Sequence, residues 1–259
     1  MSKRKPDGRK PRRYERMMNS YDRRPGSRSP GRCILIVCEG AETEPNYFAS
    51  LRDHLKLSTI SVKIKDRAGA PISVVDEAQA QVEKRKQDIR DGRANVSQFE
   101  AVWCVFDVEN PRHNQTFDRA VQVADQNEFQ LAVSTPAFEF WYVLHFERTT
   151  RPFADGDELK EYLKRHIPGY RPAMLVFDNL VPSTPTAIRY AKSILENHPQ
   201  GEERFPNPST RVHLLVEEMI EMSPSGREHS PAPAARSGSA ARARRFASTL
   251  RYRPARQLP

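Results

Sequence analysis

Apolar runs alternate with amphipathic stretches through the middle of the chain. Residues 33–38 (CILIVC) and 101–106 (AVWCVF) have no polar break, which is typical of strands buried on both faces of a parallel sheet. Residues 60–66 (ISVKIKD) alternate and predict an edge strand, and residues 130–134 (QLAVS) predict a fourth strand. Helices are expected between them, at about 44–57, 72–91 and 114–127. The alternation predicts an α/β fold with a mainly parallel four-stranded sheet and helices on both faces.

After residue 135 the pattern becomes helical. Thr135 and Pro136 form a plausible cap and first turn, and the segment 138–146 (FEFWYVLHF) is apolar almost all round and should be buried. Further helices are expected at 156–166, about 184–198 and 208–222. The run NPST at 207–210 opens the last of these, and we interpret it as a cap in preference to a phosphate site.

The charge of the chain is unevenly distributed along its 259 residues. Residues 1–32 carry a net charge of +9, residues 33–222 carry −7, and residues 223–259 carry +7. The acidic middle excludes a basic globular domain that binds nucleic acid by bulk charge alone. The two ends lack apolar periodicity and are expected to be disordered, either as solubilising extensions or as arms for phosphate backbones. The predicted organisation is a basic tail, an α/β domain, a helical extension packed on it and a second basic tail, at 1–31, 32–150, 151–222 and 223–259.

Two features bear on the cellular location. No apolar run approaches the roughly 20 residues of a membrane helix, and no apolar segment follows the basic N-terminal residues as in a secretory signal. Cys33, Cys38 and Cys104 lie within the apolar runs, which favours reduced, buried thiols over disulfides or a zinc site. We therefore expect a cytoplasmic protein with no membrane partner.

Three acidic residues follow the two most apolar strands. Glu39 comes directly after the first strand, Asp107 ends the third, and Glu109 follows two residues later. Ligands of open α/β sheets bind outside the carboxyl ends of the strands, where the strand order reverses. If the second and third strands lie on opposite sides of the first, these carboxylates converge at that point. A single acid at a strand end more often caps a helix or solvates a turn, but the joint placement favours a shared site.

Clustered carboxylates repel one another and require a cation. Oxygen ligands without nearby cysteine or histidine suit Mg²⁺ or Mn²⁺. Such an ion could activate water and stabilise the charge on a phosphodiester during in-line attack. Glu39, Asp107 and Glu109 are therefore the predicted metal ligands and catalytic residues.

The same residues carry a resemblance to known proteins. ILIVCEGAETEPNYF (34–48) followed by VFDVEN (105–110) resembles the Toprim arrangement of a glutamate after one strand and an acidic pair after a later one. Together with STPAFEFWYVLHF (134–146) and NPSTRVHLLVEEM (207–219), these segments are similar to the RloB/AbiLii family of bacterial defence proteins. The resemblance spans about 32–222. It implies a Toprim-type metal-dependent nuclease found near restriction-modification or abortive-infection genes, with some members paired with a separately encoded ATPase.

The resemblance assigns roles position by position. Glu39 matches the Toprim glutamate, and Asp107 matches the first aspartate of the pair. Glu109 matches the second acid, but Toprim proteins usually have aspartate there, and the added methylene changes the ligand geometry.

Other polar residues have two interpretations each. Glu42 and Glu44 follow Glu39 and could simply favour the positive end of a helix dipole. Glu139 is the only charged residue between Thr135 and His145. It has a functional interpretation, as a metal ligand or general base, and a structural one, as a core carboxylate that is hydrogen-bonded to its neighbours. For His145, a satisfied core position is favoured over a proton shuttle.

These observations predict a metal-dependent nuclease that hydrolyses phosphodiester bonds of DNA or RNA, tRNA included, in a bacterial anti-phage or restriction-associated defence system. The alternative is a non-catalytic nucleic-acid-binding or regulatory subunit whose degenerate site holds a metal structurally. A topoisomerase or primase is disfavoured by the chain length. A standard NTPase is disfavoured because residues 39–45 (EGAETEP) lack a phosphate-binding loop signature, so any ATP dependence would come from a partner.

Overall fold

The computed structural model describes most of the chain between the two basic ends, and every described residue lies in one compact unit, residues 32–259. The described ranges are 33–64, 70–93, 97–108, 115–198 and 203–223. The tails predicted at 1–31 and 223–259, apart from Ser223, lie outside these ranges, and the predicted boundary at residue 150 stays a prediction.

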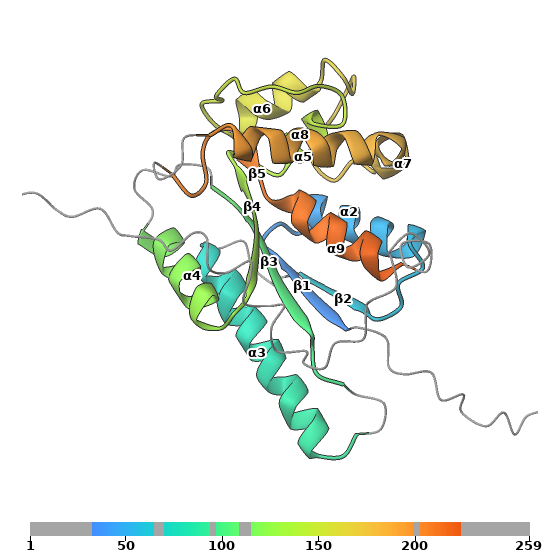
Figure 1. Cartoon of the computed structure of the whole chain (residues 1–259), viewed down its shortest axis with the longest axis vertical. Coiled ribbons are helices and arrows are strands. Elements are labelled where there is room, and N and C mark those ends of the chain that lie inside the picture. The colour runs from blue at the N-terminus through green and yellow to red at the C-terminus, as the bar shows by residue number, and fades with distance from the viewer. Residues whose placement is uncertain (1–32, 65–69, 94–96, 109–114, 199–202, 224–259) are drawn as a thin grey trace, which may run out of the picture. The chain divides into compact units, whose positions relative to one another are not determined.

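A single five-stranded sheet forms the centre of this unit (Figure 1). The strands are β1 (Ile34–Cys38), β2 (Ile60–Ile64), β3 (Ala101–Asp107), β4 (Gln130–Thr135) and β5 (Ser209–Thr210), in the spatial order β2-β1-β3-β4-β5. The four predicted strands are present and parallel to one another, with β2 at the edge. The short β5 is an addition to the predicted four, because it pairs antiparallel with β4 through only two residues, too few for a period to show.

The helices are α2 (Thr43–His54), α3 (Pro71–Arg90), α4 (Gln115–Gln126), α5 (Glu139–Val143), α6 (Gly156–Leu163), α7 (Phe177–Leu180), α8 (Thr184–Glu196) and α9 (Val212–Met222), with a 3₁₀ turn at Val181–Ser183. Helices α3 and α4 cover one face of the sheet, and α2 and α9 lie against the other (Figure 1). The expectation of an α/β layer with helices on both faces is therefore confirmed.

Alternate strand residues separate the core into two apolar clusters. On β1, Ile34, Ile36 and Cys38 join the cluster beneath α2, α5 and α9, whereas Leu35 and Val37 join the one beneath α3 and α4. All five side chains are fully buried, which explains why this strand has no polar alternation.

The region after β4 differs from its prediction. Thr135 is the last residue of β4 and caps no helix, because Ser134 and Thr135 pair with β5. The following apolar segment is buried as expected at residues 138–145, whereas Phe146 is exposed, and its α-helix is only the short α5. The capping interpretation of the run 207–210 holds for Thr210, whose Oγ1 accepts a 3.2 Å hydrogen bond from the amide of Val212, the first residue of α9. Asn207 instead exchanges two hydrogen bonds with the backbone of Phe153, with its Nδ2 donating to the carbonyl at 2.7 Å and its Oδ1 accepting from the amide at 3.2 Å.

Two further expectations can be compared with the structure. Cys33, Cys38 and Cys104 are buried free thiols, as expected. Among the described residues, no helix combines the length and the apolar character that crossing a membrane would need.

Candidate functional site

The strand order brings Glu39 and Asp107 together at the carboxyl ends of β1 and β3. Because β2 and β3 flank β1 on opposite sides, the strand order reverses between β1 and β3, where α/β sheets bind ligands. The backbone amide of Glu39 donates to the carbonyl of Val105 at 3.0 Å and continues the β1–β3 ladder. The Glu39 side chain then turns toward β3, and its Oε2 accepts a 3.4 Å hydrogen bond from the amide of Asp107.

Asp107 is strongly affected by burial and by neighbouring negative charges. Its carboxylate accepts a hydrogen bond from the backbone amide of Phe138, but its Oδ1 is buried without a hydrogen-bond partner among the described residues. Burial raises the pKa of Asp107 well above its ordinary value, and the negative charges of Glu44, Glu139 and Glu39 raise it further. A buried carboxylate oxygen with no donor is costly, and it indicates a place where a cation would be stabilised.

Glu44 is a member of this acidic group that the sequence-based interpretation assigned to helix-dipole effects. It lies in the first turn of α2, only 6% exposed, and its side chain folds over Gly40, where an added Cβ would stand 2.2 Å from the Glu44 Oε2. Burial raises the pKa of Glu44, the charge of Glu139 adds to this, and hydrogen bonds from the backbone amides of Glu44 and Gly40 oppose it. Glu44 shares the helical spacing of the buried residues Tyr47, Phe48 and Leu51, and this spacing was the signal available in the sequence.

Glu139 is the fourth carboxylate of the site. It begins α5, is 4% exposed, and accepts a 2.9 Å hydrogen bond on its Oε1 from the hydroxyl of Tyr170. The electrostatic effect of Glu139 on Asp107 and Glu44 places it in the same group. The name "acidic cluster" is used below for Glu39, Glu44, Asp107 and Glu139.

Two acids considered in the sequence, the predicted ligand Glu109 and the loop residue Glu42, are not part of the observed cluster. Glu109 lies outside the described residues, so its predicted role as a metal ligand stays a prediction. Glu42 is exposed and precedes α2 without capping it through its side chain.

The acidic cluster fits a hard divalent cation by its chemistry. It offers only carboxylate oxygens, and one of them, Oδ1 of Asp107, is buried and unsatisfied within the described ranges. Among the residues that the structure describes, however, no three histidine, cysteine, aspartate or glutamate side chains are grouped closely enough to form a ready-made metal site. A cation would therefore require these side chains to move closer together, or a ligand from a segment such as the one containing Glu109.

His145 is a core residue in the structure. Its Nδ1 is 2.9 Å from the carbonyl oxygen of Trp141, and its ring packs edge-on against the Trp141 ring. Burial lowers the pKa of His145 to about 4, so the imidazole is neutral near pH 7. The core position of His145 is therefore confirmed, but its Nε2 is buried without a hydrogen-bond partner among the described residues, so the ring is only half satisfied.

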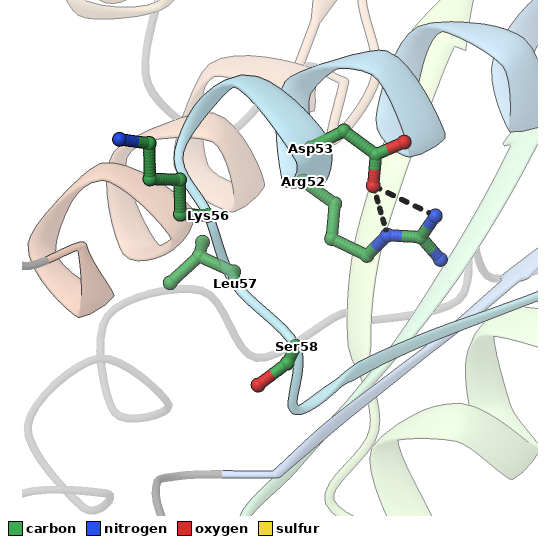
Figure 2. Close-up of a pocket in the computed structure, with 5 residues that line it drawn as sticks. All are labelled: Arg52, Asp53, Lys56, Leu57 and Ser58. Carbon is green, nitrogen blue, oxygen red and sulfur yellow. Dashed lines mark hydrogen bonds and ion pairs between the residues drawn. The ribbon is translucent and has the colours of Figure 1, made fainter.

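The surface hollows lie away from the acidic cluster. A hollow of about 460 Å³ lies at the C-terminal end of α2. It is lined by Arg52, Asp53, Lys56, Leu57 and Ser58 (Figure 2). A second hollow of about 210 Å³ lies beside α3 and includes Arg85 and Phe99. Neither is lined by any of the four acids, so the hollows do not alter the choice of site.

Comparison with known proteins gives one match. The family model described as "RloB: RloB-like protein" matches residues 34–219, a range that contains all four residues of the acidic cluster. No curated protein and no solved structure matches the chain.

Proposed function

The chain belongs to the RloB-like protein family, and from this premise and the acidic cluster we propose that it is a metal-dependent nuclease. The reaction is hydrolysis of phosphodiester bonds in DNA or RNA. The resemblance to the Toprim arrangement supports this proposal, since a glutamate follows β1 and an aspartate ends β3. The single observation that carries the proposal is the meeting of Glu39 and Asp107 at the strand-order reversal, with an oxygen on Asp107 that is buried and unsatisfied among the described residues.

Each carboxylate has a role in this proposal. Glu39 and Asp107 would hold Mg²⁺ or Mn²⁺, with Glu109 as a third ligand and Glu44 close to Asp107. A bound divalent ion supplies positive charge that makes an attacking water more acidic and stabilises the charge developing on the phosphodiester. Glu139 would serve as a further ligand or as the base that accepts the proton of the water.

The charge distribution supports nucleic acid as the substrate. The segment 33–222 has a net charge of −7 and would repel a polyanion, whereas the two ends carry +9 and +7. Basic arms that release counterions from phosphates would bring the substrate to the acidic cluster. Binding should then weaken steeply as the salt concentration rises.

The family resemblance also suggests a setting. A cytoplasmic role in a bacterial anti-phage or restriction-associated defence system, with a separately encoded ATPase as partner, forms part of this proposal. A partner of this kind would explain how a nuclease is kept inactive until it is needed.

Cleavage assays with matched variants test the proposal. The purified chain is incubated with tRNA, single-stranded DNA and duplex DNA in Mg²⁺, Mn²⁺ or EDTA. Cleavage should depend on the divalent ion and fall at least about 100-fold in Glu39→Gln, while nucleic-acid binding is retained. Glu42→Gln is the matched control, because Glu42 is an exposed glutamate of the same loop. Cleavage that persists in EDTA would refute the metal mechanism.

A non-catalytic subunit is the second candidate, and one observation favours it. No three metal-binding side chains of the described ranges are grouped as a preformed site, as expected of a degenerate centre. In that case Glu39→Gln would change the thermal stability of the metal-loaded protein, and no preparation, with or without a partner ATPase, would show metal-dependent cleavage.

A further inference from the structure

Tyr170 is a residue outside the acidic cluster that makes a direct contact with it. It lies between α6 and α7, is 2% exposed, and donates its hydroxyl hydrogen to Oε1 of Glu139 at 2.9 Å. Its ring packs edge-on against Tyr142 of α5, with 6.2 Å between the ring centroids. Both the hydroxyl and the ring of Tyr170 are therefore held against the helix that carries Glu139.

A second contact ties Tyr170 to the loop that follows β1. The side chain of Thr43, the first residue of α2, is hydrogen-bonded to the hydroxyl of Tyr170. Thr43 Oγ1 also accepts a 3.4 Å hydrogen bond from the backbone amide of Ala173. The hydroxyl of Tyr170 thus connects the start of α2, where Glu44 lies, with the start of α5, where Glu139 lies.

From this geometry we propose that Tyr170 is a positioning residue of the acidic cluster: its hydroxyl fixes the direction of the Glu139 carboxylate while the remaining acids close around a cation. The inference rests on the proposed function. A buried glutamate has three side-chain torsions, and without a donor its carboxylate would rotate away from Glu44 and Asp107, whose charges repel it. The hydrogen bond opposes that rotation, as groups that orient metal ligands from the next layer of residues do elsewhere.

The positioning role makes the hydroxyl important and the ring dispensable for cation binding. Tyr170→Phe retains the ring contact with Tyr142 and removes only the hydroxyl. Mn²⁺ binding, followed by calorimetric titration, should weaken about 10-fold in this variant. Tyr162→Phe is the matched control, because the Tyr162 hydroxyl donates to Glu147 in a tyrosine–glutamate pair outside the acidic cluster, and its Mn²⁺ affinity should equal that of the wild type.

A double-mutant cycle distinguishes positioning from a general structural effect. If Tyr170 acts through Glu139, Tyr170→Phe should not weaken Mn²⁺ binding further in a Glu139→Gln background. An equal loss in both backgrounds, or no loss in either, would overturn the proposal. Should Tyr170→Phe fail to fold, Thr43→Val removes the hydroxyl that is bonded to Tyr170, and its Mn²⁺ affinity should fall about threefold; an unchanged affinity would count against the proposal.

The same variants separate this inference from the proposed function. In EDTA, urea unfolding of the single and double variants should show a coupling of about fivefold in the unfolding equilibrium constant between Tyr170 and Glu139. If the wild type binds Mn²⁺ and Tyr170→Phe does so equally well, only the positioning role is refuted. If the wild type binds no Mn²⁺, the proposed function and the positioning role both fail, while the urea cycle still reports whether the two side chains are coupled.

Discussion

Replacing Asp107 by asparagine should stabilise the metal-free protein. The negative charges of Glu44, Glu139 and Glu39 act on the carboxylate of Asp107, whose Oδ1 is buried without a hydrogen-bond partner among the described residues. Leaving a buried polar atom unsatisfied costs about 1–3 kcal/mol, and the repulsion from neighbouring charges adds to this. The side-chain amide of the variant would still accept from the Phe138 amide, would carry no charge, and would place an NH₂ donor, which the neighbouring negative charges attract, where the unsatisfied oxygen lies. We expect the free energy of unfolding in EDTA at pH 7.5 to rise by about 2 kcal/mol.

The pH dependence of this effect has a defined sign. Because the folded-state pKa of Asp107 is raised, the folded protein binds more protons than the unfolded chain between the unfolded and the folded pKa. The stability of the wild type therefore falls as the pH rises through this interval, whereas the contribution of an asparagine does not change. The stabilisation by Asp107→Asn should grow as the pH rises through this interval and should disappear in acid, below the ordinary aspartate pKa.

Thermal melting in EDTA measures the effect. A change of about 2 kcal/mol corresponds to a rise in Tm of about 4–8 °C for a unit of this size. Asp53→Asn is the control, because Asp53 lies on the surface with its side chain 71% exposed beside Arg52, and its Tm should stay close to that of the wild type. Added Mn²⁺ should raise the Tm of the wild type and leave that of Asp107→Asn unchanged. If the variant is less stable than the wild type in EDTA at pH 7.5, the protein itself supplies hydrogen bonds or positive charge to the Asp107 carboxylate. That result would refute the claim that this carboxylate destabilises the metal-free protein.

Three further predictions concern the surroundings of the site. Gly40→Ala should displace the Glu44 carboxylate, because the added Cβ would lie 2.2 Å from its Oε2; calorimetric titration should show weaker Mn²⁺ binding, and an unchanged affinity would separate Glu44 from the site. The pKa of His145 is lowered to about 4, so its imidazole should show no titration by NMR between about pH 5.5 and 8. Because the buried ring stays neutral, the free energy of unfolding should decrease as the pH falls below about 6.5. A titration midpoint near 6.5 would contradict the burial of His145. Leu215→Ala on α9 should lower the free energy of unfolding by about 2–5 kcal/mol in urea, since Leu215 is fully buried, whereas Leu175→Ala, at a site 75% exposed, should change it by less than about 0.5 kcal/mol.

The central pair of the site could be predicted from the sequence alone. Glu39 directly follows one apolar strand and Asp107 ends the other, and parallel strands bring their carboxyl ends to the same edge of a sheet. The unusual position of Glu139 in an apolar segment was also visible, and in the structure its charge acts on Asp107 and Glu44. Glu109, predicted in the same way, lies outside the described residues and stays a prediction.

Glu44 shows where reasoning from the sequence was incomplete. The helix dipole is a sufficient local explanation for a glutamate in the first turn of a helix, so the spacing of Glu44 with Tyr47, Phe48 and Leu51 was not used as a sign of burial.

The strand β5 could not be predicted from a local pattern either. Its two polar residues carry no period, and they form a strand only because β4 provides a partner, with Ser134 lying 76 positions before Thr210 in the chain.

The order of apolar and polar positions by itself determined the kinds of elements and the parallel character of the sheet. It also determined that acids stand at the ends of β1 and β3, because burial periodicity and strand ends are local properties of the chain. Only the tertiary structure decided which carboxylates meet, that Glu44 joins them, and that the Tyr170 hydroxyl reaches Glu139. These outcomes depend on strand order and on contacts between distant segments, such as Tyr170 with Glu139, 31 residues apart, and Ala173 with Thr43, 130 residues apart. Long-range packing sets such distances, and no local pattern encodes them.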